Sequence, residues 1–335
     1  MKKYNLVVGI DVSKSKIDVC FVANPALKQH IYSVVTNNEK GFKQMLALIS
    51  KQGIALEEVL FCIENTGIYG MPLACYLNSV NADFWVVPAM EIKRSLGIRR
   101  GKNDKVDARD IAYYTYSHQH KIKLYHLPET EILKLKLLQT EREKFLKALL
   151  ALKTSEENEG FLSKEVLQEV RKAHSIAQKA LEKALKLVEE RIKEIIQQHP
   201  LLQKQYQLIT SVPGVGPQTA VYLITTTRCF KDFANWRKLA CYAGIAPFEY
   251  TSGSSVRGKT KVNHLANKKL KTLLNMCALN AKRVDKEIAE YYQRKTKEGK
   301  NKMLVLNAVR CKVLSRVFAV INRETPFVNT QKFAA

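Results

Sequence analysis

The run Leu6-Val7-Val8-Gly9-Ile10-Asp11 places five apolar or small residues directly before a carboxylate. Such a run is typical of a strand that is buried on both faces of a sheet. The polar turn Ser13-Lys14-Ser15-Lys16 follows, so we expect Asp11 at the end of this strand. One interpretation is a solvated acid, because most carboxylates in proteins are exposed. The other is an acid that is held by a partner or an ion, because an isolated carboxylate beside a buried strand is unstable.

The composition indicates a globular protein that binds a polyanion. A chain of 335 residues with 46% hydrophobic residues is long enough for two or three domains. Its formal net charge is +24, and residues 251–335 alone contain 19 Lys and Arg against 5 Asp and Glu. This asymmetry is typical of proteins that bind nucleic acids.

The sequence does not predict a membrane protein or a secreted one. No apolar run approaches the roughly 18 residues that a spanning helix needs. Asp11 interrupts any signal-peptide core that Lys2 and Lys3 might begin. The seven cysteines are odd in number, widely spaced and contain no Cys-x-x-Cys pair, which favours reduced core residues over zinc ligands or disulfides. We therefore expect a cytoplasmic protein that is associated with the nucleoid.

Residues 1–125 predict an α/β domain. Alternating apolar residues indicate strands over 17–23 and 30–36, and buried runs indicate strands over 59–63 and 84–87. Helices are expected from about residues 38, 71 and 104. The short connections between the first three strands imply an antiparallel meander. Three strands, helix, strand, helix, strand and helix form the succession of a ribonuclease-H-like fold, whose parallel strands end along one catalytic edge.

The remainder of the chain predicts helices. A 3/4 apolar spacing over 135–152 and again over 170–195 indicates two long helices, which form either an antiparallel hairpin or a dimerising coiled coil. We expect this arm to span residues 126–200 and a mainly helical domain to span residues 201–335. In that domain, residues 250–255 are expected to form a polar loop ahead of a basic amphipathic helix.

Glycines between two predicted helices give the last domain a candidate nucleic-acid element. The segment Ser211-Val212-Pro213-Gly214-Val215-Gly216-Pro217 suits a tight hairpin whose backbone amides face a phosphate, as in helix-hairpin-helix elements. An ordinary Gly-Pro turn is the alternative.

Four carboxylates follow buried elements of the first domain, namely Asp11, Glu64, Asp104 and Asp107. Asp104 and Asp107 are three residues apart at a helix start and share one face. Acids that converge repel one another unless a divalent cation neutralises them, and oxygen ligands suit Mg²⁺ or Mn²⁺. Such metal sites stabilise the attacking and leaving oxygens of a phosphodiester. Alternatively, Asp104 caps the helix and Asp107 is solvated; Asp18 is expected to face solvent.

These motifs resemble a known family of transposases. Gly9-Ile10-Asp11-Val12-Ser13-Lys14, Ile63-Glu64-Asn65-Thr66-Gly67 and Lys102-Asn103-Asp104-Lys105-Val106-Asp107-Ala108 are similar to the DEDD signature of the insertion-sequence 110/1111 type. Ala243-Gly244-Ile245-Ala246-Pro247 through Ser252-Gly253, with the helix over 267–274, is similar to the carboxy-terminal domain of that family. The resemblance covers nearly the whole chain.

The resemblance implies a RuvC-like domain, a coiled-coil arm and a second domain that supplies a serine nucleophile. It implies that Asp11, Glu64, Asp104 and Asp107 are the catalytic, metal-binding acids and that Ser252 is the nucleophile. It also implies recombination of double-stranded donor and target DNA, guided by a bridge RNA that the insertion sequence itself encodes.

A serine adds a capability that the acids alone lack. A hydroxyl that attacks a phosphodiester conserves the bond energy as a phosphoserine ester, so strands are exchanged without external energy. Ser254 and Ser255 are alternatives on residue type alone. We expect a dimer or tetramer, and the nucleic-acid contacts are predicted at the basic residues and hairpin glycines Arg99, Arg100, Lys102, Gly214, Gly216, Arg257, Lys259, Lys261, Lys268, Lys269 and Lys271.

Three other classes of protein are weighed against a transposase. A junction nuclease would use the same acids with water as nucleophile, and a covalent protein–DNA adduct trapped by denaturant would distinguish the two. An actin-like or sugar-kinase ATPase also begins with Gly-Ile-Asp but needs a later Asp-Gly-Gly phosphate loop, which this sequence lacks. An architectural DNA-binding protein would explain the charge and leave the four acids unexplained. We therefore predict a transposase.

Overall fold

The computed structural model describes residues 2–23, 30–65, 67–95, 97, 103–156, 164–252, 256–263 and 265–329. The chain forms two compact units, Met1–Leu127 and Pro128–Ala335. The first corresponds to the domain predicted over residues 1–125. The second includes both the arm and the domain predicted after residue 200, and the division between those two stays a prediction.

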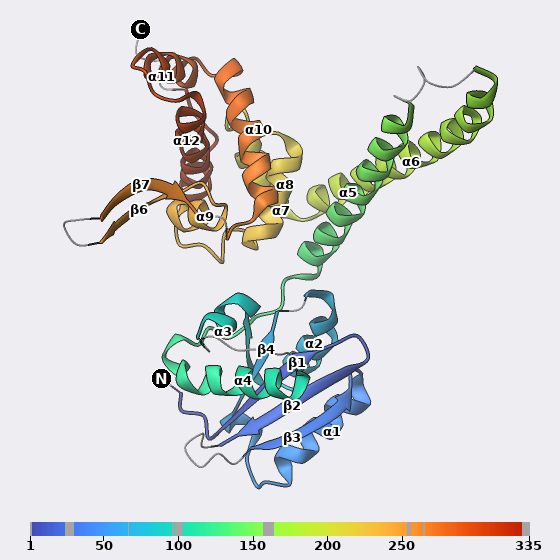
Figure 1. The fold of residues 1–335 in the computed structure, drawn as a ribbon, viewed down its shortest axis with the longest axis vertical. Helices are drawn as coiled ribbons and strands as arrows, with labels where there is room; N and C mark the ends of the chain where they lie inside the picture. The colour runs from blue at the N-terminus through green and yellow to red at the C-terminus, as the bar shows by residue number, and fades with distance from the viewer. Residues whose placement is uncertain are drawn as a thin grey trace. The chain divides into compact units, whose positions relative to one another are not determined.

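A mixed five-stranded sheet forms the centre of the first unit (Figure 1). Its strands are β1 (Leu6–Val12), β2 (Lys16–Val22), β3 (Ile31–Thr36), β4 (Val59–Glu64) and β5 (Asp83–Val87). The strand order is β3-β2-β1-β4-β5. β1, β2 and β3 pair antiparallel, whereas β1, β4 and β5 pair parallel. The predicted meander and parallel half are therefore confirmed, and the sheet with its helices fits a ribonuclease-H-like domain.

Helices cover both faces of this sheet, as Figure 1 shows. They are α1 (Glu39–Ser50), α2 (Met71–Ser79), α3 (Ala89–Ser95) and α4 (Asp104–Ser117), of which α3 was not predicted. Because side chains alternate along a strand, each strand serves two cores. In β1, Val8 and Ile10 pack with α1 and α2, whereas Val7 packs with α4. Asp11 therefore lies on the α4 face of the sheet.

Gly9 lets α4 approach β1 closely. A Cβ atom at this position would lie 2.3 Å from the Ala108 carbonyl oxygen and 2.3 Å from the Ala112 amide nitrogen. Both atoms belong to the backbone of α4, so neither can move aside without moving the helix. Ala108 and Ala112 are themselves fully buried. Three small residues in contact thus determine how near the amino-terminal end of α4 comes to Asp11.

The second unit is mainly helical. Its helices are α5 (Thr130–Glu156), α6 (Lys164–Gln198), α7 (Pro200–Thr210), α8 (Pro217–Thr227), α9 (Trp236–Tyr242), α10 (Lys268–Val284), α11 (Lys286–Lys297) and α12 (Lys302–Arg323). α5 and α6 run side by side. Leu135 of α5 and Ile192 of α6 belong to the same buried core as Leu274 of α10 and Val313 of α12.

The polar loop predicted over residues 250–255 is wrong in part, because a β-hairpin occupies this region. β6 (Pro247–Ser252) pairs antiparallel with β7 (Val256–Val262), and Figure 1 shows the hairpin extending from the helices of its unit. β-Branched residues, including Val256 and Val262, favour a strand over a linker. Residues 253–255 lie outside the described part of the chain.

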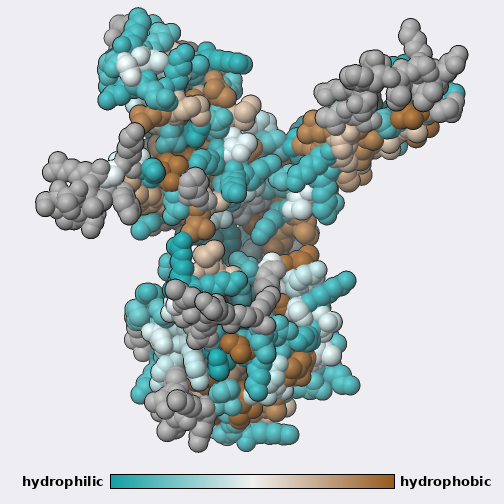
Figure 2. Space-filling view, in the orientation of Figure 1, coloured by the Kyte–Doolittle hydropathy of each residue, from teal (hydrophilic) through white to brown (hydrophobic). Residues whose placement is uncertain are grey.

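The long helices α5 and α6 also expose apolar side chains. Leu150, Ile176 and Leu187 are 62%, 72% and 68% exposed, and Figure 2 shows hydrophobic residues along this pair. Among the described residues, no helix is both long enough and apolar enough to cross a bilayer.

Candidate active site

Three carboxylates converge where β1 meets the amino-terminal end of α4. Asp11, Asp104 and Asp107 each contribute one carboxylate oxygen, and these oxygens lie within 4.8 Å of one another. All three side chains are half-buried. Asp11 is the penultimate residue of β1, one position earlier in the strand than the sequence suggested. Three of the four predicted acids are thus adjacent in the structure.

The local sequence fixes how α4 presents its two acids. The Asn103 side chain caps the helix by accepting a hydrogen bond of 3.0 Å from the Lys105 amide. Asp104 and Asp107 occupy the first turn, where the positive end of the helix dipole stabilises negative charge. Asn103 therefore has the capping role that the alternative interpretation gave to Asp104, which leaves the Asp104 carboxylate available to the cluster.

Glu64 joins the group from the adjacent strand. β4 pairs in parallel with β1 up to Ile63 opposite Ile10, so Glu64 follows at the register of Asp11 and on the same face. Burial raises the pKa of Asp11 to about 6, with further contributions from Glu64, Asp107, Asp104 and Asp18 in that order. An ordinary aspartate is ionised well below this value. Asp11 therefore holds a proton more readily than an ordinary aspartate, and the acids around it would attract a cation.

Lys16 and Asp18 of β2, which the sequence did not place in the site, lie beside the acid cluster. Asp18 is directly opposite Asp11 in the β1–β2 ladder and is 1% exposed, so the expectation that it faces solvent is wrong. It accepts a hydrogen bond from the Tyr32 hydroxyl. The Lys16 Nζ atom lies 3.0 Å from Asp18 Oδ2 and 3.0 Å from Asp104 Oδ2. The sequence does not give the register of β1 against β2, which places Asp18 opposite Asp11.

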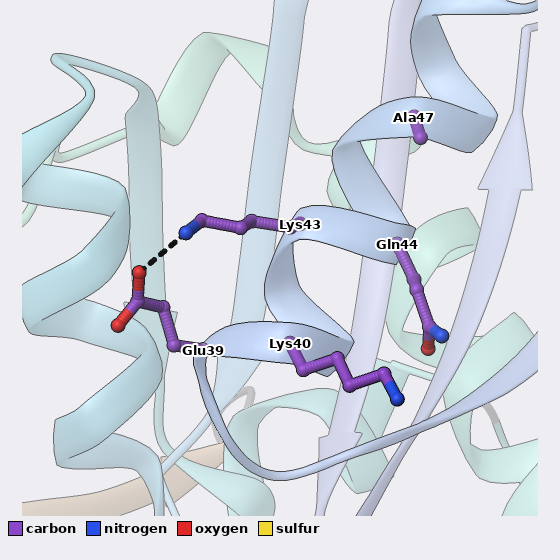
Figure 3. A pocket seen from close by; sticks show the side chains of 5 residues that line it. All are labelled: Glu39, Lys40, Lys43, Gln44 and Ala47. Carbon is purple, nitrogen blue, oxygen red and sulfur yellow. Dashed lines mark ion pairs between the residues drawn. The ribbon is translucent and has the colours of Figure 1, made fainter.

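Described residues of the first unit line two of its surface hollows. One is beside Glu64 and is lined by Ile63, Glu64, Asn65, Gly67, Gly70, Met71, Ala74, Val86 and Tyr125. The other is on α1, where Figure 3 shows Glu39, Lys40, Lys43, Gln44 and Ala47, with an ion pair of 2.6 Å between Glu39 and Lys43. The second hollow lies on the exposed face of successive turns of α1. The side chains that line it are not part of the acid cluster.

The predicted nucleophile belongs to the second unit. Ser252 is the last residue of β6 and is paired with Val256 of β7. The alternatives Ser254 and Ser255 lie outside the described residues, as do Arg99, Arg100 and Lys102. Arg257, Lys259 and Lys261 are residues of β7, the partner strand of Ser252.

The remaining predicted nucleic-acid residues lie at two helix starts. Gly214 and Gly216 lie between α7 and α8, but Gly214 also has a structural role. Its φ is +92°, and a Cβ atom there would lie 2.6 Å from the Cys277 carbonyl oxygen of α10. Lys268, Lys269 and Lys271 begin α10. Lys269 forms an ion pair of 3.1 Å with Glu143 of α5, which supplies an anion for one of the three.

The donor set of the acid cluster fits a hard divalent cation. Carboxylate oxygens are the preferred ligands of Mg²⁺ and Mn²⁺. Three of them already converge within 4.8 Å, and burial together with the neighbouring acids raises the pKa of Asp11 to about 6, so a cation bound there would offset unfavourable negative charge. Asp11, Asp104 and Asp107 are therefore the candidate ligands, with Glu64 beside them.

Comparison with known proteins identifies the family. A family model described as "Transposase IS116/IS110/IS902 family" matches residues 206–293. A second model, of DEDD transposases of the IS110 type and described as "Transposase", matches residues 8–157. The two matched ranges together span most of the chain and include all four acids and Ser252.

Individual relatives are named after DNA rearrangement. The pilin gene-inverting proteins of Moraxella bovis and Moraxella lacunata are each 27% identical over 327 residues, which covers 96% of this chain and 97% of each relative. A 43.6 kDa protein of the insertion element IS110 from Streptomyces coelicolor is 30% identical over 146 residues, covering 44% of this chain and 35% of that protein.

A structural comparison finds "T. thermophilus RuvC in complex with Holliday junction substrate", with 12% identity, a TM-score of 0.28, and coverage of 36% of this chain and 100% of that one. The family models and the sequence relatives agree with the DEDD motifs found in the sequence. The chain therefore belongs to the IS110-type transposase family and is a DNA transposase or recombinase.

Proposed function

We propose that this transposase cuts and rejoins double-stranded DNA through a serine nucleophile, Ser252, with the assistance of a divalent ion held by Asp11, Glu64, Asp104 and Asp107. The observation that carries the proposal is the convergence of three carboxylate oxygens within 4.8 Å at the junction of β1 and α4. Such a cluster is unfavourable for folding alone, because its charges repel. A catalytic use accounts for its presence.

The residues of the first unit prepare the site. Gly9 allows α4 to lie against β1, and Asn103 caps the helix so that Asp104 and Asp107 face Asp11. An ion held by these acids would supply positive charge to a scissile phosphate and its leaving oxygen. The acids would orient that charge, and the raised pKa of Asp11 would make ion binding weaker as the pH falls toward 6.

The serine supplies the covalent chemistry. The bond from Ser252 Oγ to phosphorus forms as the bond from phosphorus to one deoxyribose oxygen breaks; the serine proton passes to solvent and the leaving oxygen takes one up. A second deoxyribose hydroxyl then reverses this exchange and releases the serine. The number of phosphodiester bonds is unchanged, so no external energy is needed.

A metal-dependent junction nuclease with water as nucleophile is the alternative. The two mechanisms differ in their products, because hydrolysis leaves free ends and strand transfer leaves rejoined DNA. We expect purified protein with Mg²⁺ and paired donor and target duplexes to yield rejoined strands. Asp107→Asn should abolish cleavage altogether, whereas a Ser252→Ala protein that still nicks DNA at the wild-type rate would establish the nuclease.

We further propose that a structured RNA from the element selects the DNA sites. The support is the family membership and the charge of residues 251–335, with 19 basic against 5 acidic residues. Sequencing the RNA that co-purifies with the protein tests this. One enriched RNA encoded next to the gene is expected; RNA drawn evenly from the whole transcriptome would contradict guidance and leave the serine chemistry untouched.

A further inference from the structure

Lys16 is a basic residue in contact with the acid cluster, and neither the sequence motifs nor the family assignment gives it a role. It begins β2, and its ammonium nitrogen reaches across to α4, 88 residues later in the chain. There it lies 3.0 Å from Asp104 Oδ2 while remaining 3.0 Å from Asp18 Oδ2. Asp104 is one of the three acids whose oxygens converge.

The backbone of Lys16 is held in place. Ser13 donates two hydrogen bonds to the Lys16 carbonyl, one of 3.0 Å from its amide and one of 2.8 Å from its hydroxyl. The ammonium is also held in place, because the buried carboxylate of Asp18 needs a positively charged partner in addition to the hydrogen bond from the Tyr32 hydroxyl. The ring of Tyr32 in turn contacts the Lys105 ammonium at 5.2 Å. The backbone and the ammonium of Lys16 are thus both held in place, and the ammonium lies beside Asp104.

The ammonium and a divalent ion would both draw on the same carboxylate. An ammonium at hydrogen-bonding distance stabilises the Asp104 charge, and it repels a second cation placed among the same oxygens. Asp18 holds Lys16 whether or not a divalent ion is bound. It is paired with Asp11 across the β1–β2 ladder, and its carboxylate lies 3.0 Å from the Lys16 ammonium nitrogen. The side chain of Lys16 is 43% exposed, so it has room to withdraw from Asp104.

We propose that Lys16 is an internal counter-cation of the acid cluster: it holds Asp104 while no divalent ion is bound and yields that carboxylate when one binds. The proposal rests on the metal site of the proposed function. It makes Lys16 a positioning residue that lowers the affinity for the metal. In exchange, Lys16 keeps the clustered acids from destabilising the fold.

Titration of Mn²⁺ into the full-length protein, followed by calorimetry, tests this. Lys16→Met removes the charge and keeps the length of the side chain; Lys14→Met is the matched control, because Lys14 is exposed in the same turn. We expect Lys16→Met to bind Mn²⁺ about three- to tenfold more tightly than wild type, with Lys14→Met and Lys16→Arg close to wild type. Unchanged or weaker binding by Lys16→Met would overturn the proposal.

Thermal unfolding provides a second readout and a test of folding. Without metal, Lys16→Met should have a lower melting temperature than wild type, and saturating Mn²⁺ should reduce this difference. An unchanged difference would contradict competition between Lys16 and the metal ion for Asp104. The metal site itself is checked with Asp107→Asn. If wild type and Asp107→Asn bind Mn²⁺ equally, the metal site fails, whereas a loss of binding in Asp107→Asn with no effect of Lys16→Met rejects the lysine alone.

Discussion

Asp11 is an acid of the cluster whose pKa is raised in the folded protein, and we propose that it also binds the metal ion. Burial and four neighbouring acids raise its pKa from 3.8 to about 6. A group whose pKa is higher in the folded state stabilises the fold fully below its unfolded pKa, and this contribution is lost as the pH rises through the folded value. The protein without bound metal should therefore lose stability between about pH 4 and 6 on account of this group.

The Asp11→Asn variant isolates that contribution. The substituted side chain cannot ionise. The free energy of unfolding of this variant should therefore be close to that of wild type near pH 4 and exceed it at pH 7.5 by about 1 to 2 kcal/mol, after allowance for solvent screening. Differential scanning calorimetry in chelator at several pH values measures the difference. A difference in the free energy of unfolding that does not change with pH would show that the pKa of Asp11 is not raised in the folded protein.

Gly9 is the second residue on which the site depends. Gly9→Ala would place a methyl group 2.3 Å from two backbone atoms of α4, so the helix must move. We expect a loss of about 2 kcal/mol or more in the free energy of unfolding, together with weaker Mn²⁺ binding. Gly70→Ala is the control, because its Cβ atom would meet only Ile63 Cγ2 at 3.7 Å. Equal effects of the two substitutions on metal binding would refute the packing role.

Among the elements, the sheet of the first unit was predictable and its side-chain network was not. Buried runs and alternation identified all five strands, and Asp11 after a buried strand, with Asp104 and Asp107 at a helix start, indicated the convergence of these three acids. The contact of Lys16 with Asp104 depends on cross-strand register and on how closely α4 approaches β1. Neither quantity is encoded in local periodicity.

The hairpin of β6 and β7 was missed for a different reason. Serine and glycine in residues 252–255 are typical of linkers, and they outweighed the strand-forming residues on either side. Gly214 shows the converse. Its position suggested a phosphate contact, whereas its φ of +92° and its closeness to α10 already require glycine.

The start of α10 is the element at which nucleic-acid binding is most readily measured. Lys268 and Lys271 lie in its first turn, and Lys269 is paired with Glu143. Replacing Lys268 and Lys271 with Gln should weaken binding to any DNA sequence and reduce the salt slope by about two, since each lost phosphate contact lowers it by about 0.9. Lys269→Gln should have a smaller effect. A salt slope that the double substitution leaves unchanged would place the DNA elsewhere.

For the whole molecule, we propose that the exposed apolar residues of α6 form a contact between copies of the chain. Ile176 and Leu187 are 72% and 68% exposed and lie eleven residues apart, which is about three helical turns. Changing both to Glu should lower the mass measured by light scattering and leave the helical content unchanged. An unaltered mass would show that this stripe does not hold an oligomer together. Lys179→Glu on the same helix is the control for added charge.

The proposed chemistry requires a serine and a set of acids that belong to different compact units. Trapping the reaction of the full-length protein with labelled DNA in Mg²⁺ by denaturant, and mapping the attachment by mass spectrometry, tests both at once. We predict a phosphoserine bond at Ser252 that disappears in Ser252→Ala and in Asp107→Asn. Cleaved DNA without any covalent protein adduct, or an adduct at another residue, would contradict it.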